Sequence, residues 1–312
     1  MQPLEMVCLC GSYDLKSSFG PAFDRFPDIR LLRPQEVDDP ASIRHAMAFK
    51  PGAAAFDPYP NLELVCSVGA GVDALVVHPG LKPDVTVSRL MLETQAHAIA
   101  GLAAWMVIGW TRRLWDYADL QGRREWNADY LVQPSEVPVG ILGYGAIGRV
   151  VGEALLALGF PVLGYAGTAR QVGPVDVQSG PAALVEIAAK SRALINLLPL
   201  TEATRGILSA DLFARMPPDS ILVNLGRGEH LVEADLLAAL DQGRPGYAAL
   251  DVFAPEPLPE DHPFWAHPKI RITPHVAGEG NFFEVSDWIA AAVRQFEAGE
   301  PPQGLVDRTK GY

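Results

Sequence analysis

The segment Val139-Gly-Ile-Leu-Gly143-Tyr-Gly145-Ala-Ile-Gly148 decides the fold of this chain. Its apolar start predicts a buried strand, its end opens a helical pattern, and the three glycines have the G-x-G-x-x-G spacing. Gly143 permits a tight turn, Gly145 lets the backbone approach a pyrophosphate, and Gly148 allows the helix to pack closely on the strand. Since backbone amides at a helix start bind diphosphate, the segment predicts a dinucleotide site. The expected contacts are Gly143, Gly145, Ala146, Ile147 and Gly148.

Strand and helix patterns alternate around and beyond this loop. Strands are predicted at residues 137–142, 161–165, 193–198, 221–225, 247–252 and 270–273. Because these runs are almost continuously apolar, both faces of the sheet should be buried. Helical patterns at 146–158 and 233–241, each closed by a glycine, are the crossovers expected of a doubly wound parallel sheet.

The first hundred residues predict another α/β lobe. Strands at residues 6–10, 29–32, 62–68 and 85–87 alternate there with segments of helical composition. Residues 94–120 are apolar and free of proline, and they predict one long helix that links the lobes and offers a surface to a partner subunit. A last helix at 283–298 is expected to return to the first lobe, which would make that lobe discontinuous.

Composition and charge narrow the classes of partner. The chain has 312 residues, of which 49% are hydrophobic, enough for a sizeable core. Its formal net charge of −12 argues against nucleic acid or an anionic membrane as a partner, because both would be repelled. An acidic protein that binds anionic small molecules must place cations locally, so particular arginines become the candidates.

Cysteine and histidine usage predicts neither disulfides nor a metal site. Cys8 and Cys10 alternate within an apolar strand, where a core role is favoured over a two-cysteine metal site, and Cys66 stands alone. The histidines other than His275 lack ligand spacing: His45, His78, His97, His230, His262 and His267. The first residues lack the features of a signal peptide, so a cytoplasmic location is expected. The apolar run 96–110 is too short to span a membrane and is expected to be a buried helix.

The end of the strand at 161–165 bears on the choice of cofactor. An Asp or Glu there normally accepts hydrogen bonds from the ribose 2′-hydroxyl of NAD, and this chain has none. Thr168 and Arg170 follow instead, and a guanidinium can pair with a 2′-phosphate. NADP is therefore the preferred cofactor and NAD a possible one, unless Arg170 only points into solvent.

Three further segments each follow a predicted strand: Asn224-Leu-Gly-Arg227-Gly, Asp251-Val-Phe-Ala-Pro-Glu256-Pro and Thr273-Pro-His275. Ligands of an open parallel sheet bind outside the carboxyl ends of its strands, so these segments should share one cleft. Reduction of a 2-keto acid needs a cation for the carboxylate, a proton donor and a hydride donor. Arg227 suits the first role and His275 the second, with Glu256 favouring the protonated imidazole. Taken singly, each residue also fits a surface or turn role.

Asp251 has two interpretations from the sequence. It is a candidate to contact the nicotinamide carboxamide, and it is equally suited to cap the turn at the end of its strand. Both interpretations place it at the same edge of the sheet as the three candidate catalytic residues.

These motifs resemble the D-2-hydroxyacid dehydrogenase family, through the glycine loop, N-x-x-R-G at Asn224, D-V-F-x-x-E-P-L-P at Asp251 and P-H-x-A at Pro274. Within it the chain is similar to the glyoxylate/hydroxypyruvate reductase A branch, through the segments at Asn196, Gly71 and Val306. The resemblance implies an α/β fold of two doubly wound parallel-sheet domains with a cleft between them. A flavodoxin-like substrate domain would comprise residues 1–100 and 285–312, and a Rossmann cofactor domain residues 101–284.

The resemblance also implies NADPH-dependent reduction of glyoxylate and hydroxypyruvate by a homodimer. The substrate contacts that it implies are Phe49, Gly69, Ala70, Gly71, Val72 and Arg227, and further cofactor contacts are Leu198 and Pro199. Phe49 stands where this branch commonly has tryptophan, and Gly167 where it often has an arginine for the 2′-phosphate. Glu279, an acid after His275, favours monocarboxylate over dicarboxylate substrates.

Two other functions are compatible with the same motifs. One is another dehydrogenase of the family, acting on phosphoglycerate or a bulky 2-keto acid. The other is a non-catalytic, cofactor-sensing protein such as a corepressor, which the intact Arg227, Glu256 and His275 disfavour.

Overall fold

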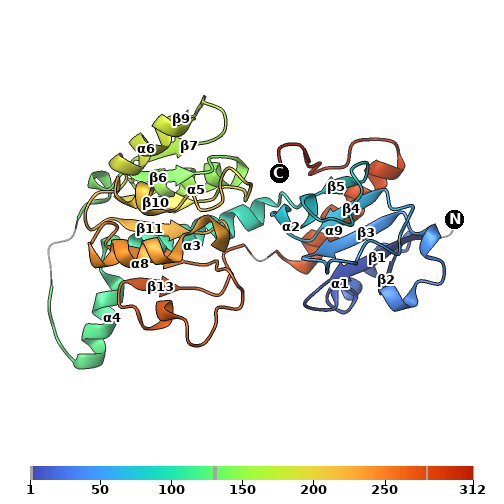
Figure 1. Ribbon diagram of the computed structural model, residues 1–312, viewed down its shortest axis with the longest axis horizontal. Helices are drawn as coiled ribbons and strands as arrows, with labels where there is room; N and C mark the ends of the chain where they lie inside the picture. Colours follow the sequence, from blue (N-terminus) through green and yellow to red (C-terminus); the bar gives the residue numbers. More distant parts are fainter. Residues whose placement is uncertain (1–2, 129–131, 279, 312) are drawn as a thin grey trace. The chain divides into compact units, whose positions relative to one another are not determined.

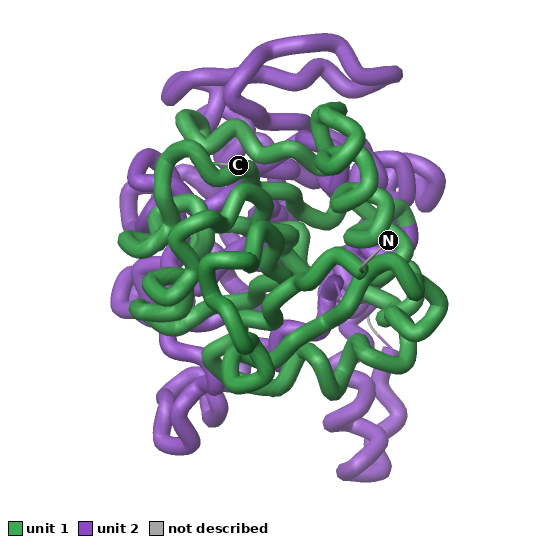
Figure 2. The backbone as a smooth tube through the Cα atoms, turned by 90° about the vertical axis from the view of Figure 1, so that its right-hand side faces the viewer, with its two compact units in different colours: residues 1–93, 280–312 green, residues 94–279 purple. Residues whose placement is uncertain are grey.

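The computed structural model describes residues 3–128, 132–278 and 280–311. The chain forms two compact units, the first from Met1–Glu93 and Gly280–Tyr312 and the second from Thr94–Glu279, and both chain ends belong to the first (Figure 2). The predicted boundaries after residues 100 and 284 lie a few residues beyond these. The substrate-binding and cofactor-binding roles of the two parts stay predictions.

The second unit is built on an eight-stranded sheet in the order β13-β12-β11-β10-β6-β7-β9-β8 (Figure 1). All neighbours are parallel except the hairpin β8–β9. The strands are β6 Val139–Leu142, β7 Val162–Tyr165, β8 Arg170–Val172, β9 Val175–Gln178, β10 Ala193–Asn196, β11 Ile221–Asn224, β12 Tyr247–Leu250 and β13 Ile270–Ile272. The helices are α3 Glu93–Thr111, α4 Leu114–Arg123, α5 Ala146–Ala157, α6 Pro181–Lys190, α7 Ala210–Phe213 and α8 Glu233–Asp241.

Both faces of this sheet are buried, as the continuous apolar runs predict. Ile141 of β6 and Ile195 of β10 pack in one hydrophobic cluster, while their neighbours Leu142 and Leu194 pack in another. Successive side chains of a strand point to opposite faces, so two separate clusters mean that both faces are covered. The doubly wound prediction is confirmed. Chain order reverses between β6 and β10, which makes their carboxyl ends the switch point of the sheet.

The first unit has a five-stranded parallel sheet in the order β2-β1-β3-β4-β5, the flavodoxin-like order that was predicted. Its strands are β1 Leu4–Cys10, β2 Ile29–Leu32, β3 His45–Phe49, β4 Leu64–Ser67 and β5 Thr86–Ser88. Its helices are α1 Leu15–Phe23, α2 Asp73–Val76 and α9 Phe282–Glu297. The return of the last helix to the first lobe is confirmed, because Ile289 and Val293 of α9 pack in one cluster with Met6 and Met47 of the sheet.

The prediction of one continuous helix over residues 94–120 is wrong. Helix α3 ends at Thr111 and α4 begins at Leu114, with Arg113 between them in the left-handed region at φ 52°. The Arg113 guanidinium donates to Asp116 at 2.7 Å, which places an ion pair across the start of α4. A left-handed residue ends an α-helix, and here no glycine or proline marks it in the sequence. Among the described residues, no helix is both long and apolar enough to cross a membrane.

Candidate active site

The glycine loop joins β6 to α5 at the switch point of the second unit. Gly143 has φ 98°, and a Cβ atom there would collide with the backbone of Leu197 and Leu198, in the loop after β10. A Cβ on Gly148 would collide with the carbonyl oxygen of Gly143, so this glycine allows the close helix packing that was predicted. By contrast, a Cβ on Gly145 would meet no protein atom within 4 Å.

The open side of this loop is the part that fits a dinucleotide. Gly145 and Ala146 are exposed at the start of α5, where helix amides carry partial positive charge. Ile147 is half-buried and Gly148 is buried beneath them. No protein atom near Gly145 requires the absence of a side chain there, so the loop is open at this position.

Arg170 lies against the same loop. It is the first residue of β8, and its guanidinium donates to the carbonyl oxygen of Tyr144 at 2.6 Å and to that of Thr168 at 3.1 Å. Thr168 itself is exposed between β7 and β8. The structure thus brings Thr168 and Arg170 together beside the glycine loop, and the alternative of an arginine that only points into solvent does not hold.

The loop after β10 carries Leu198 and Pro199. The amide of Leu198 donates to Asn196 Oδ1 at 3.2 Å, and the carbonyl oxygen of Pro199 accepts from Thr204 Oγ1 at 2.7 Å. The backbone of Leu198 lies directly against Gly143, so this loop packs on the glycine loop.

Arg227 follows the next strand, β11. Its backbone amide donates to His230 Nδ1 at 3.0 Å, and its carbonyl oxygen accepts from Asn224 Nδ2 at 3.0 Å. The guanidinium, which is half-buried, donates to the carbonyl oxygen of Gly226 at 2.8 Å. After it, Gly228 lies so close to the backbone of Phe253 and Ala254 that the Arg227 loop packs directly on the loop that leads to Glu256.

His275 and Glu256 form a direct contact. His275 Nδ1 lies 2.9 Å from each carboxylate oxygen of Glu256, and the side chains are 36% and 21% exposed. A carboxylate only accepts hydrogen bonds, so Nδ1 carries a hydrogen and Nε2 is directed away from Glu256. Glu256 is oriented in turn by the amide of Phe253, which donates to Oε1 at 3.1 Å. An imidazole held in this way can give or take a proton at Nε2.

The backbone at His275 is unusual and is held on both sides. His275 has φ 55°, in the left-handed region that side chains other than glycine rarely adopt. Asp251, only 1% exposed, accepts from Thr273 Oγ1 at 2.5 Å and from the amides of Val276 and Ala277 at 3.0 Å each. Of the two interpretations of Asp251, the structure therefore supports the turn cap, and a cofactor contact stays a prediction. Strained residues held by their surroundings are concentrated at functional sites.

Comparison with known proteins identifies the family. Residues 104–277 match the model described as D-isomer specific 2-hydroxyacid dehydrogenase, NAD binding domain, which is more than half of the chain. The chain belongs to the D-isomer-specific 2-hydroxyacid dehydrogenase family. It is thus an NAD(P)-dependent oxidoreductase, and the family resemblance inferred from the sequence motifs is confirmed.

Relatives of this dehydrogenase cover nearly its full length. A glyoxylate/hydroxypyruvate reductase A of Serratia proteamaculans is 38% identical over 92% of this chain and 93% of its own. A D-isomer specific 2-hydroxyacid dehydrogenase from Xanthobacter autotrophicus, solved in complex with NADPH and MES, has a TM-score of 0.92 and 33% identity over 99% of this chain and 100% of its own. An NADPH-dependent glyoxylate/hydroxypyruvate reductase from Sinorhizobium meliloti, solved with NADP and sulfate, has a TM-score of 0.92 and 31% identity over 99% of both chains.

The remaining predicted residues of the dehydrogenase lie at one edge of its five-stranded sheet. Phe49 is the last residue of β3, and its ring is 6.0 Å from that of Tyr13, after β1. A Cβ on Gly69, after β4, would lie 3.5 Å from the Phe49 ring. Ala70 and Gly71 are accessible there, whereas the Val72 side chain is buried in the core. Glu279, expected to select against dicarboxylates, lies outside the described residues.

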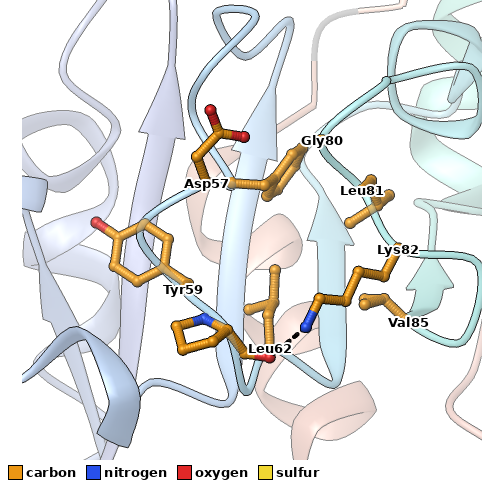
Figure 3. Close-up of a pocket in the computed structure, with 9 residues that line it drawn as sticks. Asp57, Tyr59, Leu62, Gly80, Leu81, Lys82 and Val85 are labelled. Carbon is orange, nitrogen blue, oxygen red and sulfur yellow. Dashed lines mark hydrogen bonds between the residues drawn. The ribbon is translucent and has the colours of Figure 1, made fainter.

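A surface pocket of the first unit contains none of the predicted residues (Figure 3). It is lined by Phe56, Asp57, Tyr59, Pro60, Leu62, Gly80, Leu81, Lys82 and Val85. These residues precede β4 and β5, so the pocket lies at the amino ends of those strands, opposite the edge that carries Gly69. Lys82 donates to the carbonyl oxygen of Pro60 at 2.6 Å across it. We assign no chemistry to this pocket.

Cys8 is part of the core, as expected, and Cys10 is half-buried against it. Cys8 and Cys66 are buried, and burial raises the pKa of each thiol to about 12, so both stay protonated at neutral pH. In the described part of the chain, three or more His, Cys, Asp or Glu side chains do not gather in a way that could hold a metal ion.

Sequence reasoning missed one residue of this region, His230, which it treated as an isolated histidine. His230 is fully buried and contacts the Arg227 loop and the Pro199 loop. Only its place three residues after Arg227 links it to the site in the sequence, because Pro199 is far away along the chain.

Proposed function

We propose that this dehydrogenase reduces small 2-keto acids, glyoxylate and hydroxypyruvate, to 2-hydroxy acids, with NADPH preferred and NADH as a second cofactor. The observation that carries the proposal is the Glu256–His275 pair after β12 and β13, on the sheet edge that also bears the glycine loop. The names of the relatives from Serratia and Sinorhizobium support the choice of substrates.

Each candidate residue has a distinct part in this reaction. Arg227 holds the substrate carboxylate and polarises the carbonyl, and His275 gives a proton from Nε2 to the carbonyl oxygen as negative charge develops there. Glu256 orients the imidazole through its contact with Nδ1. The glycine loop, Leu198, Pro199, Thr168 and Arg170 hold the cofactor. When bound, the nicotinamide supplies the hydride that reduces the carbonyl carbon.

The first unit is assigned the substrate loop in this proposal. Backbone amides of Gly69, Ala70, Gly71 and Val72 bind the substrate carboxylate, and Phe49 covers the substrate. The accessibility of Ala70 and Gly71 supports this assignment, whereas Val72 as a whole residue is only 3% exposed and gives it no support. A homodimer, which the family resemblance implies, and a cytoplasmic location are part of the same proposal.

A parallel assay tests the function. The purified protein is mixed with NADPH or NADH and with glyoxylate, hydroxypyruvate or phenylpyruvate, and oxidation is followed by nicotinamide absorbance. We expect the highest kcat/KM with NADPH and the two small acceptors. Faster turnover of phenylpyruvate would indicate a dehydrogenase for bulky substrates. Cofactor binding without turnover of any acceptor would indicate a cofactor-sensing protein instead.

Replacing Arg170 by alanine is expected to raise the KM for NADPH by roughly ten-fold or more, because a charge-assisted hydrogen bond contributes ~1.5–3 kcal/mol. The KM for NADH should change by less than about two-fold, since NADH lacks the 2′-phosphate. Arg30→Ala is the matched control, an exposed arginine on β2 whose contact with Glu5 is long, at 3.4 Å. Equal losses with both cofactors would contradict the role given to Arg170.

A further inference from the structure

His230 connects two loops that come from different strands. It closes the short turn Gly228–His230 after Arg227 and is fully buried. Nδ1 accepts from the amide of Arg227 at 3.0 Å and lies 3.0 Å from Asn196 Nδ2. On the other side of the ring, Nε2 lies 3.3 Å from the carbonyl oxygen of Pro199.

These partners define the state of the imidazole. An amide can only donate, so Nδ1 carries no hydrogen, and a carbonyl can only accept, so Nε2 carries one. Burial lowers the pKa of His230. The hydrogen bond to the Pro199 carbonyl oxygen acts in the opposite direction, and the nearby Arg227 charge lowers the pKa further. At neutral pH the ring is therefore a neutral link with one accepting and one donating end.

Two asparagines complete this arrangement. Asn196 and Asn224 are paired in register as the last residues of β10 and β11, and both are fully buried. Asn196 Nδ2 donates to Asn224 Oδ1 at 2.9 Å, and Asn224 in turn binds the carbonyl oxygen of Arg227. Because buried polar groups are costly unless satisfied, this network holds each member in one geometry.

We propose that His230 is a positioning residue with two separable functions: its Nδ1 end sets Arg227 for the keto acid, and its Nε2 end sets the Pro199 loop for NADPH. The inference rests on the proposed function, because it takes Arg227 as the substrate group and Pro199 as part of the cofactor site. His230 itself contacts neither ligand and transfers no proton.

Two conservative substitutions distinguish the functions of the two ring nitrogens of His230. The side-chain oxygen of asparagine reaches about as far as Nδ1, so His230→Asn keeps the acceptor for Arg227 and loses the donor to Pro199. The amide nitrogen of glutamine reaches about as far as Nε2, so His230→Gln keeps the donor and loses the acceptor. A residue that only stabilised the fold would not distinguish these two variants.

The experiment measures KM and kcat for glyoxylate and, separately, the Kd for NADPH by fluorescence titration. We expect His230→Gln to raise the KM for glyoxylate by about ten-fold with the NADPH Kd within about two-fold, and His230→Asn to do the reverse, since one buried hydrogen bond changes an equilibrium by about that factor. Equal changes in both parameters for the two variants, or none, would overturn the proposal.

Further variants keep the test decisive. Thr204 is half-buried, and Thr204→Val removes the other hydrogen bond to the Pro199 carbonyl oxygen. This variant should raise the Kd for NADPH without changing the KM for glyoxylate, and it can be measured even if both His230 variants fail to fold. An unchanged Kd for NADPH would count against the proposal. His78 is the matched control, because Nε2 lies 3.0 Å from the Gly52 carbonyl oxygen and Nδ1 accepts from Gly80. Its Asn and Gln variants should leave the NADPH Kd unchanged.

The failure of this proposal can be distinguished from that of the proposed function. Absence of turnover by the wild-type enzyme would refute the proposed function, whereas the NADPH titrations would still test whether the Nε2 end of His230 positions the Pro199 loop.

Discussion

Replacing His275 by alanine is expected to lower kcat for glyoxylate by roughly 10²–10⁴-fold, because the variant loses the general acid that we propose. Binding of NADPH should be retained, since the glycine loop and Arg170, the cofactor contacts that we propose, are left in place by this substitution. The measurement is steady-state turnover together with an NADPH fluorescence titration. The expected outcome is an inactive protein that binds its cofactor with an unchanged Kd.

A second histidine–carboxylate pair provides the control. His262 Nε2 lies 3.2 Å from Glu233 Oε2, and this half-buried pair resembles the His275–Glu256 pair in chemistry. His262→Ala should keep kcat within about three-fold of wild type, because neither His262 nor Glu233 has a part in the proposed reaction. Comparable turnover of the His275→Ala and His262→Ala variants would refute the role of His275 as proton donor.

Replacing Gly228 by alanine is expected to lower both the stability and the turnover of this enzyme. The new Cβ would overlap the carbonyl of Phe253 and lie 2.5 Å from the amide nitrogen of Ala254. These are backbone atoms, so the clash cannot be relieved by a side-chain rotation, and the two loops must separate. Overpacking of this kind costs about 1–3 kcal/mol or more, and a displacement of Arg227 by ~1 Å is enough to lower turnover by ~10²-fold.

The melting temperature and kcat/KM for glyoxylate check this prediction, and both should fall. Gly122→Ala is the matched control, because Gly122 lies in α4 and a Cβ there would meet nothing within 4 Å. An alanine inside a helix stabilises by about 0.5–1 kcal/mol relative to glycine, so this control should melt at the same temperature or slightly higher. A Gly228→Ala variant that melts and turns over like wild type would show that the two loops are not held together there.

Much of the fold and of the candidate site could be predicted because the decisive signals are local. The glycine loop and the residues after β11 each combine a buried strand with a turn of particular composition, and the residues before His275 combine a partly buried strand with such a turn. Strand β3, His45–Phe49, was missed for the opposite reason. It lacks β-branched residues and begins with a histidine, and it is a strand because β1 and β4 pair on either side of it.

Other differences arise from contacts between distant residues. No glycine or proline lies at the break at Arg113, so a prediction from helical composition extends the helix through it. The sequence places Asp251 at the site but does not decide whether it contacts the cofactor or caps a turn. The turn cap depends on the amides of Val276 and Ala277, which only folding brings near. His230 depends in the same way on Pro199.

The paired strands β10 and β11 fix the distance from the hydrophobic core to the two asparagines at the edge of the candidate site. Each has four residues, they are aligned residue for residue, and each ends in the asparagine that meets the other. Because successive side chains alternate between the two faces of a sheet, deleting one residue from either strand would move the side chains on one side of the deletion to the opposite face. The apolar side chains would still find a hydrophobic layer on the other face, whereas the asparagine would turn away from its partner. Insertions and deletions should therefore be rejected within these eight positions.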